Sequence, residues 1–172
     1  QIELLADIGS AANGNPGGGK PENCYVFGDK MYFTAIDNFD AIYETDGTTN
    51  GTQYLVLGNN FDTRIRSSRP TFIETNFGGM TKLNFIGQRW ILSANVDDRA
   101  LYSGDNSSRT FTNNGGNDAV ITSLVKLNNA LYFIEEDDMN ISSLLRYNSS
   151  GTTTLNGNIT ATGIIGSLFN FG

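Results

Sequence analysis

Apolar residues occur in short runs of β-branched and aromatic side chains, and Gly, Asn and Asp interrupt these runs every few residues. This pattern indicates strands joined by turns, and no segment has the spacing of apolar positions that marks an amphipathic helix. We therefore expect an all-β fold. The expected strands lie at 24–27, 31–36, 41–44, 53–57, 80–86, 89–94, 100–103, 109–112, 121–127, 130–134, 143–147 and 152–155.

A turn followed by an apolar, aromatic strand recurs three times along the chain. The turn falls at Gly28, Gly87 and Asn128, positions separated by 59 and 41 residues. The segments Ala41-Ile-Tyr43 and Ala100-Leu-Tyr102 share the offset of 59, which favours copies of one small sheet. Repetition of this size is typical of β-propellers, whose blades are four-stranded antiparallel sheets. We expect blades at about 22–58, 80–113 and 120–156.

Both ends of the chain resemble parts of further blades. Residues 2–8 look like the last strand of a blade, and residues 164–172 end with the apolar strand and glycine that would open the next one. We therefore expect residues 1–172 to be one propeller fragment, with three full blades plus strands of flanking blades. The number of blades in the complete ring stays open.

One segment resembles a known repeat. Ile42-Tyr-Glu-Thr-Asp-Gly-Thr-Thr-Asn-Gly-Thr52 is similar to the motif Leu-Trp-x-Ser-Asp-Gly-Thr-x-x-Gly-Thr of a propeller repeat in secreted and cell-surface proteins of Bacteroidota. Lys30-Met-Tyr-Phe-Thr-Ala35 and Leu4-Leu-Ala-Asp-Ile8 resemble other parts of the same repeat. The second unit keeps only Leu101-Tyr-Ser-Gly-Asp105 of the motif, and the third has Asn148-Ser-Ser-Gly151 where Asp-Gly-Thr belongs.

The resemblance implies an exported protein, often secreted by the type 9 system with a C-terminal sorting domain. It also implies adhesion, or association with the secretion or gliding apparatus, as the kind of role to expect. The motif itself favours a role in folding. Asp46 is placed to accept backbone hydrogen bonds, Gly47 can take the left-handed conformation, and the hydroxyls of Thr48 and Thr52 can fix the turn.

Composition excludes several functional classes. The net charge of −7 argues against a nucleic-acid groove, which needs a basic stripe. No run of about 18 apolar residues is present, so we expect no membrane-spanning helix. The sequence contains no His, which removes the usual base of a Ser or Cys triad. Cys24 is the only Cys, so no internal disulfide forms, and we expect it to be a small buried hydrophobic residue.

Acidic turns are the candidate metal sites. Asp37 and Asp40 in the first unit, and Glu135, Asp137 and Asp138 in the third, offer the oxygen ligands that calcium prefers. No Asp-x-Asp-x-Asp-Gly frame surrounds them, and a solvated acidic rim is the alternative. Paired carboxylates at 97–98 or 135–138 could serve acid–base catalysis, but acidic turns at matching places in successive blades favour the rim. We expect no catalytic residue and no cofactor other than calcium.

The sequence therefore predicts a non-enzymatic, exported β-propeller module for protein–protein interaction or adhesion. We expect its interface to lie in loops at one rim, such as 9–21 and 58–70. A glycan-binding or glycan-processing surface protein of the same architecture is the alternative, in which exposed aromatic residues would lie over a polar pocket. A third hypothesis is a three-blade protein that oligomerises to cover its open strand edges.

Overall fold

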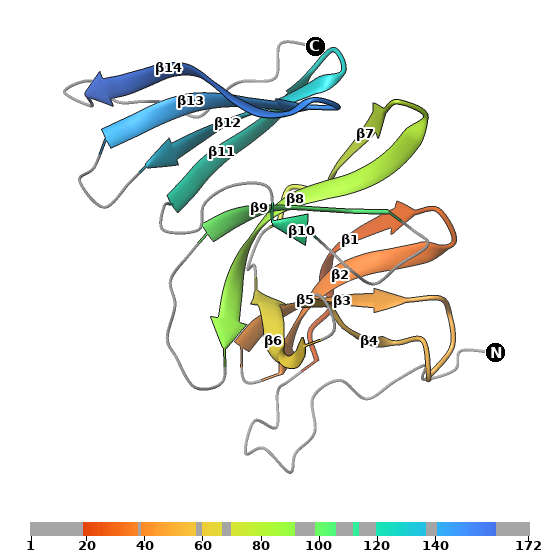
Figure 1. Cartoon of the computed structure of the whole chain (residues 1–172). Coiled ribbons are helices and arrows are strands. Elements are labelled where there is room, and N and C mark those ends of the chain that lie inside the picture. The colour runs from red at the N-terminus through yellow and green to blue at the C-terminus, as the bar shows by residue number, and fades with distance from the viewer. Residues whose placement is uncertain are drawn as a thin grey trace.

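The computed structural model confirms that the protein is an all-β protein built from antiparallel strands, and the described part of the chain contains no helix (Figure 1). The residues that the structure describes are 19–37, 39–57, 60–66, 70–91, 99–105, 112–113, 120–136 and 141–160. The expected flanking strands at 2–8 and 164–172 lie outside these ranges.

The strands form three antiparallel meanders, which we call units 1, 2 and 3. Unit 1 contains β1 (Glu22–Phe27), β2 (Lys30–Asp37), β3 (Phe39–Thr45) and β4 (Gln53–Tyr54). Unit 2 contains β7 (Ile73–Phe77), β8 (Met80–Ile91), β9 (Arg99–Gly104) and β10 (Thr112–Asn113). Unit 3 contains β11 (Val120–Leu127), β12 (Ala130–Glu136), β13 (Ile141–Asn148) and β14 (Gly151–Thr160).

Two further strands connect units 1 and 2. They are β5 (Val56–Leu57) and β6 (Asn60–Arg66). β6 pairs with β5, with the second half of β8, and through one residue pair with β3. The expectation of a loop across 58–70 is therefore wrong for Asn60–Arg66. Between units 2 and 3 a single parallel pair joins Val120 of β11 to Arg99 of β9.

Each unit opens with a two-residue hairpin, and the three hairpins are evenly spaced. They lie at positions 28–29, 78–79 and 128–129, so the interval between them is 50 residues. The first residue of each turn has a left-handed backbone, with φ of 63° at Gly28, 63° at Gly78 and 54° at Asn128. Glycine and asparagine tolerate this conformation better than other residues. All three hairpins lie along one side of the molecule (Figure 1).

The predicted hairpin at Gly87 is wrong. Gly87 lies inside β8, is buried, and pairs with Ala100 of β9. The offset of 59 residues also fails for the next strand, because Ala41 pairs with Ala35 while Ala100 pairs with Gly87. Unit 2 consequently begins at Ile73 rather than near residue 80. The strands expected in units 1 and 3 are present, with some of their ends shifted by a few residues.

The core lies between the units. One cluster of buried side chains joins Phe27, Tyr32, Ile42 and Leu55 of the first part of the chain to Leu83, Phe85, Ala100 and Tyr102 of unit 2. A second cluster joins Phe77 and Leu101 of unit 2 to Ile121, Leu131, Phe133, Leu145 and Tyr147 of unit 3. Adjacent residues of a strand point to opposite faces of its sheet, so unit 2 packs against unit 1 with one face and against unit 3 with the other.

Equivalent positions of the three units face the same way. Phe33, Leu83 and Phe133 stand 50 residues apart. Leu83 packs against unit 1 and Phe133 packs against unit 2, each toward the preceding unit. Phe33 lies in a third cluster, on the face of unit 1 opposite to Tyr32, which packs against unit 2. The units are therefore stacked head to tail.

Candidate functional site

The loop between β3 and β4 contains the Asp-Gly-Thr motif. The Oδ1 atom of Asp46 accepts hydrogen bonds from the backbone N–H of Thr48 at 2.9 Å and from its hydroxyl at 2.7 Å. Gly47 has a φ of 87°, in the left-handed region that a side chain would disfavour. The hydrogen bonds from Thr48 hold the pKa of Asp46 below its ordinary value.

Hydroxyl groups close the same loop. The Thr52 hydroxyl donates to the carbonyl oxygen of Thr48 at 2.7 Å and lies 2.8 Å from the hydroxyl of Thr45. The backbone N–H of Gly51 donates to the Thr48 hydroxyl at 2.9 Å. The motif residues thus bond to the loop itself, which confirms the predicted role of Asp46 and the two threonines in fixing the turn.

Gly51 lets the Asp46 carboxylate lie against the loop. A Cβ atom at Gly51 would lie 1.9 Å from Oδ1 and 2.2 Å from Cγ of Asp46. We expect Gly51→Ala to displace the carboxylate from Thr48, to raise the pKa of Asp46 toward its ordinary value and to lower Tm. An NMR titration of the Asp46 carboxyl group and thermal unfolding measure both effects.

The lowered pKa of Asp46 also determines how stability changes with pH. Because this pKa is lower in the folded than in the unfolded state, the ionised carboxylate stabilises the fold above the unfolded pKa, and this stabilisation is lost as the pH falls through the folded pKa. In Gly51→Ala, the loss of stability over this pH range should be smaller. Asn50→Ala, at an exposed residue of the same loop, is the matched control. An unchanged pKa of Asp46 in Gly51→Ala would contradict the prediction.

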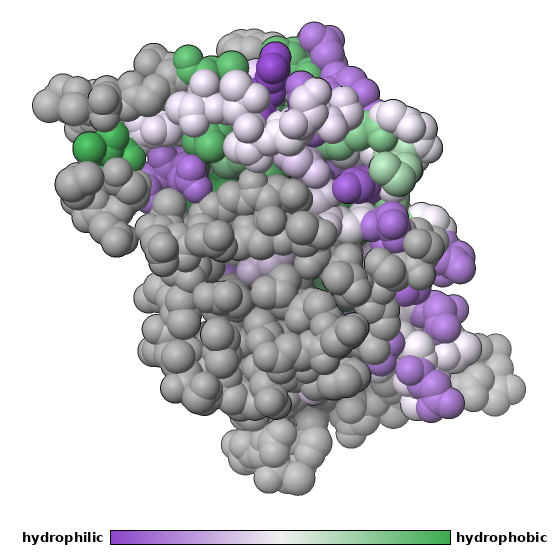
Figure 2. All heavy atoms as spheres, in the orientation of Figure 1, coloured by the Kyte–Doolittle hydropathy of each residue, from purple (hydrophilic) through white to green (hydrophobic). Residues whose placement is uncertain are grey.

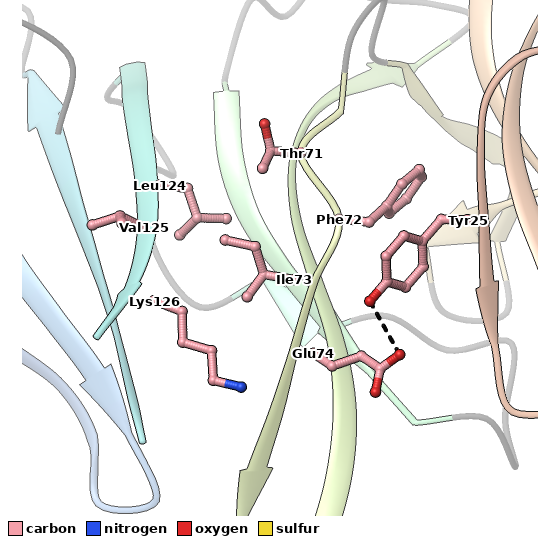
Figure 3. Close-up of a pocket in the computed structure, with 8 residues that line it drawn as sticks. All are labelled: Tyr25, Thr71, Phe72, Ile73, Glu74, Leu124, Val125 and Lys126. Carbon is pink, nitrogen blue, oxygen red and sulfur yellow. Dashed lines mark hydrogen bonds between the residues drawn. The ribbon is translucent and has the colours of Figure 1, made fainter. Parts of the chain in front are cut away.

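A pocket lies where the first strands of the three units approach one another (Figure 3). It has a volume of about 530 Å³, within the range of small-ligand and side-chain pockets. β1 contributes one lining residue, β7 and the segment before it contribute four, and β11 contributes three. The lining residues are Tyr25, Thr71, Phe72, Ile73, Glu74, Leu124, Val125 and Lys126.

One side of the pocket is aromatic and carries a carboxylate. The rings of Tyr25 and Phe72 are tilted, with centroids 5.6 Å apart, and Phe72 also contacts the buried ring of Phe85 edge-on. The hydroxyl of Tyr25 donates to Oε1 of Glu74 at 3.1 Å. Burial, together with this hydrogen bond and the charge of Glu74, raises the pKa of Tyr25. Tyr25 therefore remains a neutral donor that fixes the position of the carboxylate.

The strand that carries Glu74 is itself fixed by a buried amide. Asn84 of β8 is fully buried, and its Nδ2 donates to the carbonyl oxygen of Ile73 at 3.0 Å and to the hydroxyl of Thr75 at 2.9 Å. These two acceptors flank Glu74 in β7. The amide thus locks the strand on both sides of the pocket carboxylate.

The other side of the pocket is apolar and ends in a cation. Leu124 faces Ile73, and Lys126 extends toward the end of the pocket where Glu74 lies (Figure 3). Lys126 is exposed, and it makes no ion pair or hydrogen bond within the described part of the chain. The pocket therefore presents a positive and a negative group, separated by more than ion-pair distance, on either side of an apolar strip.

The predicted calcium ligands belong to two separate turns of the sequence. Asp37 ends β2 and Asp40 lies in β3, and their backbones pair with Phe39 and Ile36. Glu135 lies in β12 of unit 3, while Asp137 and Asp138 fall outside the described residues. No group of three or more Cys, Asp or Glu side chains suited to a metal occurs in the ranges that the structure covers. Calcium binding stays a prediction.

Cys24 is exposed on β1, so its prediction as a buried residue is wrong. Among the aromatic residues, Tyr32, Phe85 and Phe133 pack between units. Tyr25 is only partly buried and instead lines the pocket.

The pocket residues were not identified from the sequence. The signal that locates them is the interval of 50 residues, which aligns Tyr25 with Val125 and places Glu74 and Leu124 at equivalent positions of β7 and β11. Alignment on Gly87 conceals this correspondence.

Within the described residues, no helix is long and apolar enough to cross a membrane. Comparison with protein-family models, with curated proteins and with solved structures finds no match to this chain.

Proposed function

We propose that units 1–3 are successive blades of a β-propeller. The support is the packing of the two clusters, in which each unit presents the same face to its predecessor. Leu83 and Phe133, which are equivalent residues, occupy equivalent places in the two interfaces. Head-to-tail interfaces of this kind generate a ring when the rotation between units closes. The first strands of the three units, β1, β7 and β11, all line one pocket. This arrangement is the one expected if they are the inner strands of blades around a propeller axis.

In this proposal the protein is a non-enzymatic, exported module that binds a partner protein at the cell surface. The observation that carries the partner-binding part is the exposure of large apolar residues at the hairpin ends. Val26, Met80 and Leu127 have relative exposures of 67%, 59% and 54%, and each comes from a different unit. In Figure 2, hydrophilic residues interrupt paler and hydrophobic ones along the side where these hairpins lie. Export follows only from the resemblance of the Ile42–Thr52 segment to the bacterial repeat.

Glycan binding is a second candidate function. Tyr25 and Phe72 form an aromatic pair beside the carboxylate of Glu74, and sugar rings commonly bind to such combinations of apolar faces and hydrogen-bonding groups. This candidate uses the pocket alone and does not use the exposed residues of the hairpins.

Photo-crosslinking in the source cells tests the proposed partner binding. A photoreactive amino acid at Leu127 should give covalent adducts with a protein, because this exposed side chain lies at the hairpin side. The same amino acid at Val120, an exposed apolar residue at the opposite end of β11, should give none. Adducts are detected by gel mobility and by their sensitivity to proteases.

The outcomes separate the two candidates. Protease-sensitive adducts formed only from Leu127 support a protein partner. Adducts that resist proteases and are cleaved by glycosidases would favour the glycan alternative. Equal labelling from Leu127 and Val120, or none from either, would contradict partner binding at the hairpin side.

A further inference from the structure

We infer that the pocket between β1, β7 and β11 recognises a peptide segment of the partner that carries a basic side chain next to an acidic one. This inference rests on the proposed function and names the chemistry that the binding site selects. The basic side chain binds Glu74, and the acidic side chain binds Lys126.

Glu74 is prepared to receive a cation. Its Oε1 accepts the Tyr25 hydroxyl, while its other oxygen has no hydrogen-bond partner among the residues that the structure describes. Glu74 is partly buried, and a hydrogen bond to a charged donor is stronger in partly buried surroundings than in bulk water. The rings of Tyr25 and Phe72 beside it offer apolar contact to the methylene groups of a lysine or arginine, and their faces attract the charge.

Lys126 supplies the opposite charge on the other strand. Its ammonium group is exposed and makes no ion pair with Glu74, so both groups remain available to a ligand (Figure 3). A ligand with charges of both signs forms a charge-assisted hydrogen bond with each group, whereas the hydroxyls of a neutral sugar can hydrogen-bond to both groups but bring no opposite charge to either. The apolar strip of Ile73 and Leu124 between them suits the aliphatic part of a peptide.

The surroundings of the pocket fit a macromolecular partner. Leu127 is exposed and lies two residues after Val125, on the same face of β11 as this lining residue. A bound chain that places a basic residue in the pocket can therefore also cover apolar surface at Leu127. The protein's net charge of −7 additionally favours approach of a segment with basic residues.

The test uses purified protein and an immobilised array of random octapeptides. We expect bound peptides to be enriched in Lys or Arg with an Asp or Glu within two residues. Glu74→Gln should abolish the enrichment in basic residues, and Lys126→Met should abolish the enrichment in acidic ones. For the best peptide, measured in solution by fluorescence anisotropy, Glu74→Gln should weaken binding about tenfold or more, since a hydrogen bond to a charged group is lost.

Matched controls keep the result specific. Glu136→Gln in β12 and Lys20→Met before β1 change the same charges outside the pocket lining and should leave both enrichment and affinity unchanged. Thermal unfolding of each variant shows whether it is folded. The inference would be overturned if the bound peptides were not enriched in charged residues, or if Glu74→Gln left the enrichment in basic residues unchanged. Binding to a glycan array that depends on Glu74 would also overturn it and assign the pocket to sugars.

Failure of this inference is distinguishable from failure of the proposed function. Protein adducts from Leu127 together with peptide selection that ignores Glu74 would leave partner binding intact and remove the pocket from it. Absence of adducts from Leu127 would count against the proposed function whatever the array shows.

Discussion

Phe85→Ala is expected to lower the free energy of unfolding by about 3–5 kcal/mol, the range for truncation of a buried aromatic residue. Phe85 has a relative exposure of 0% and lies in the cluster that joins units 1 and 2. Its ring packs against Phe72 and Tyr102, with centroid distances of 5.5 Å and 5.8 Å. The substitution removes these contacts and leaves a cavity that the surrounding strands cannot fill without moving.

Equilibrium unfolding in urea measures the change in free energy. Met80→Ala, which truncates a largely exposed side chain in the same strand, should change stability by no more than about 0.5 kcal/mol. A loss below about 1 kcal/mol for Phe85→Ala would mean that the contact between units 1 and 2 does not form the core.

Lys30→Met is expected to cost about 3 kcal/mol because it leaves a buried carboxylate without its cation. The Nζ atom of Lys30 lies 3.1 Å from Oε2 of Glu44, and the two side chains have relative exposures of 19% and 2%. Gln53 donates a second hydrogen bond to Glu44 at 3.3 Å, which cannot replace the lost charge. The pair therefore fixes β3 just before the Asp-Gly-Thr loop.

A double variant separates loss of the pair from loss of packing. Adding Glu44→Gln to Lys30→Met removes the uncompensated charge and should restore part of the stability. Lys20→Met, at an exposed position, is the control and should have almost no effect. If Lys30→Met and Lys20→Met have the same stability, the ion pair contributes nothing to the fold.

Local patterns were sufficient to predict units 1 and 3. In unit 3, β-branched and aromatic runs flank Asn128-Asn129, and the structure has a hairpin at these residues. Strong turn signals next to apolar runs define strands without help from the rest of the chain. The Asp-Gly-Thr loop was predictable for the same reason, because the bonds of Asp46 reach no further than Thr48.

Unit 2 was mispredicted because its sequence contains two glycine segments, and each of them could form the turn of the first hairpin. Gly78-Gly79 forms the turn, while Gly87 lies in a long strand that has β9 along one edge and β7 and then β6 along the other. A glycine between apolar runs can mark a turn, but within a strand it can instead mark the close approach of a neighbouring backbone. Only the pairing of β8 with its neighbours decides between these possibilities, and that information is not local.

The pocket could not be predicted from local patterns. Glu74 and Lys126 are separated by 52 positions and line the same pocket only because units 2 and 3 are stacked. Neither residue belongs to a motif. The acidic turns indicated a metal site instead because their carboxylates are adjacent in sequence. A candidate site made of single residues from several strands becomes visible only when the register of the repeat is known.

NMR measurement of nuclear Overhauser effects tests the central claim, which is that three four-stranded units repeat every 50 residues and stack head to tail. Phe77 is the informative residue. We expect cross-strand contacts between Phe77 and Met80 across the turn, and contacts between the rings of Phe77 and Tyr147, whose centroids are 5.3 Å apart. Contacts that instead pair Ile86 with Arg89 around a turn at Gly87, without a contact from Phe77 to Tyr147, would contradict both the repeat and the stacking.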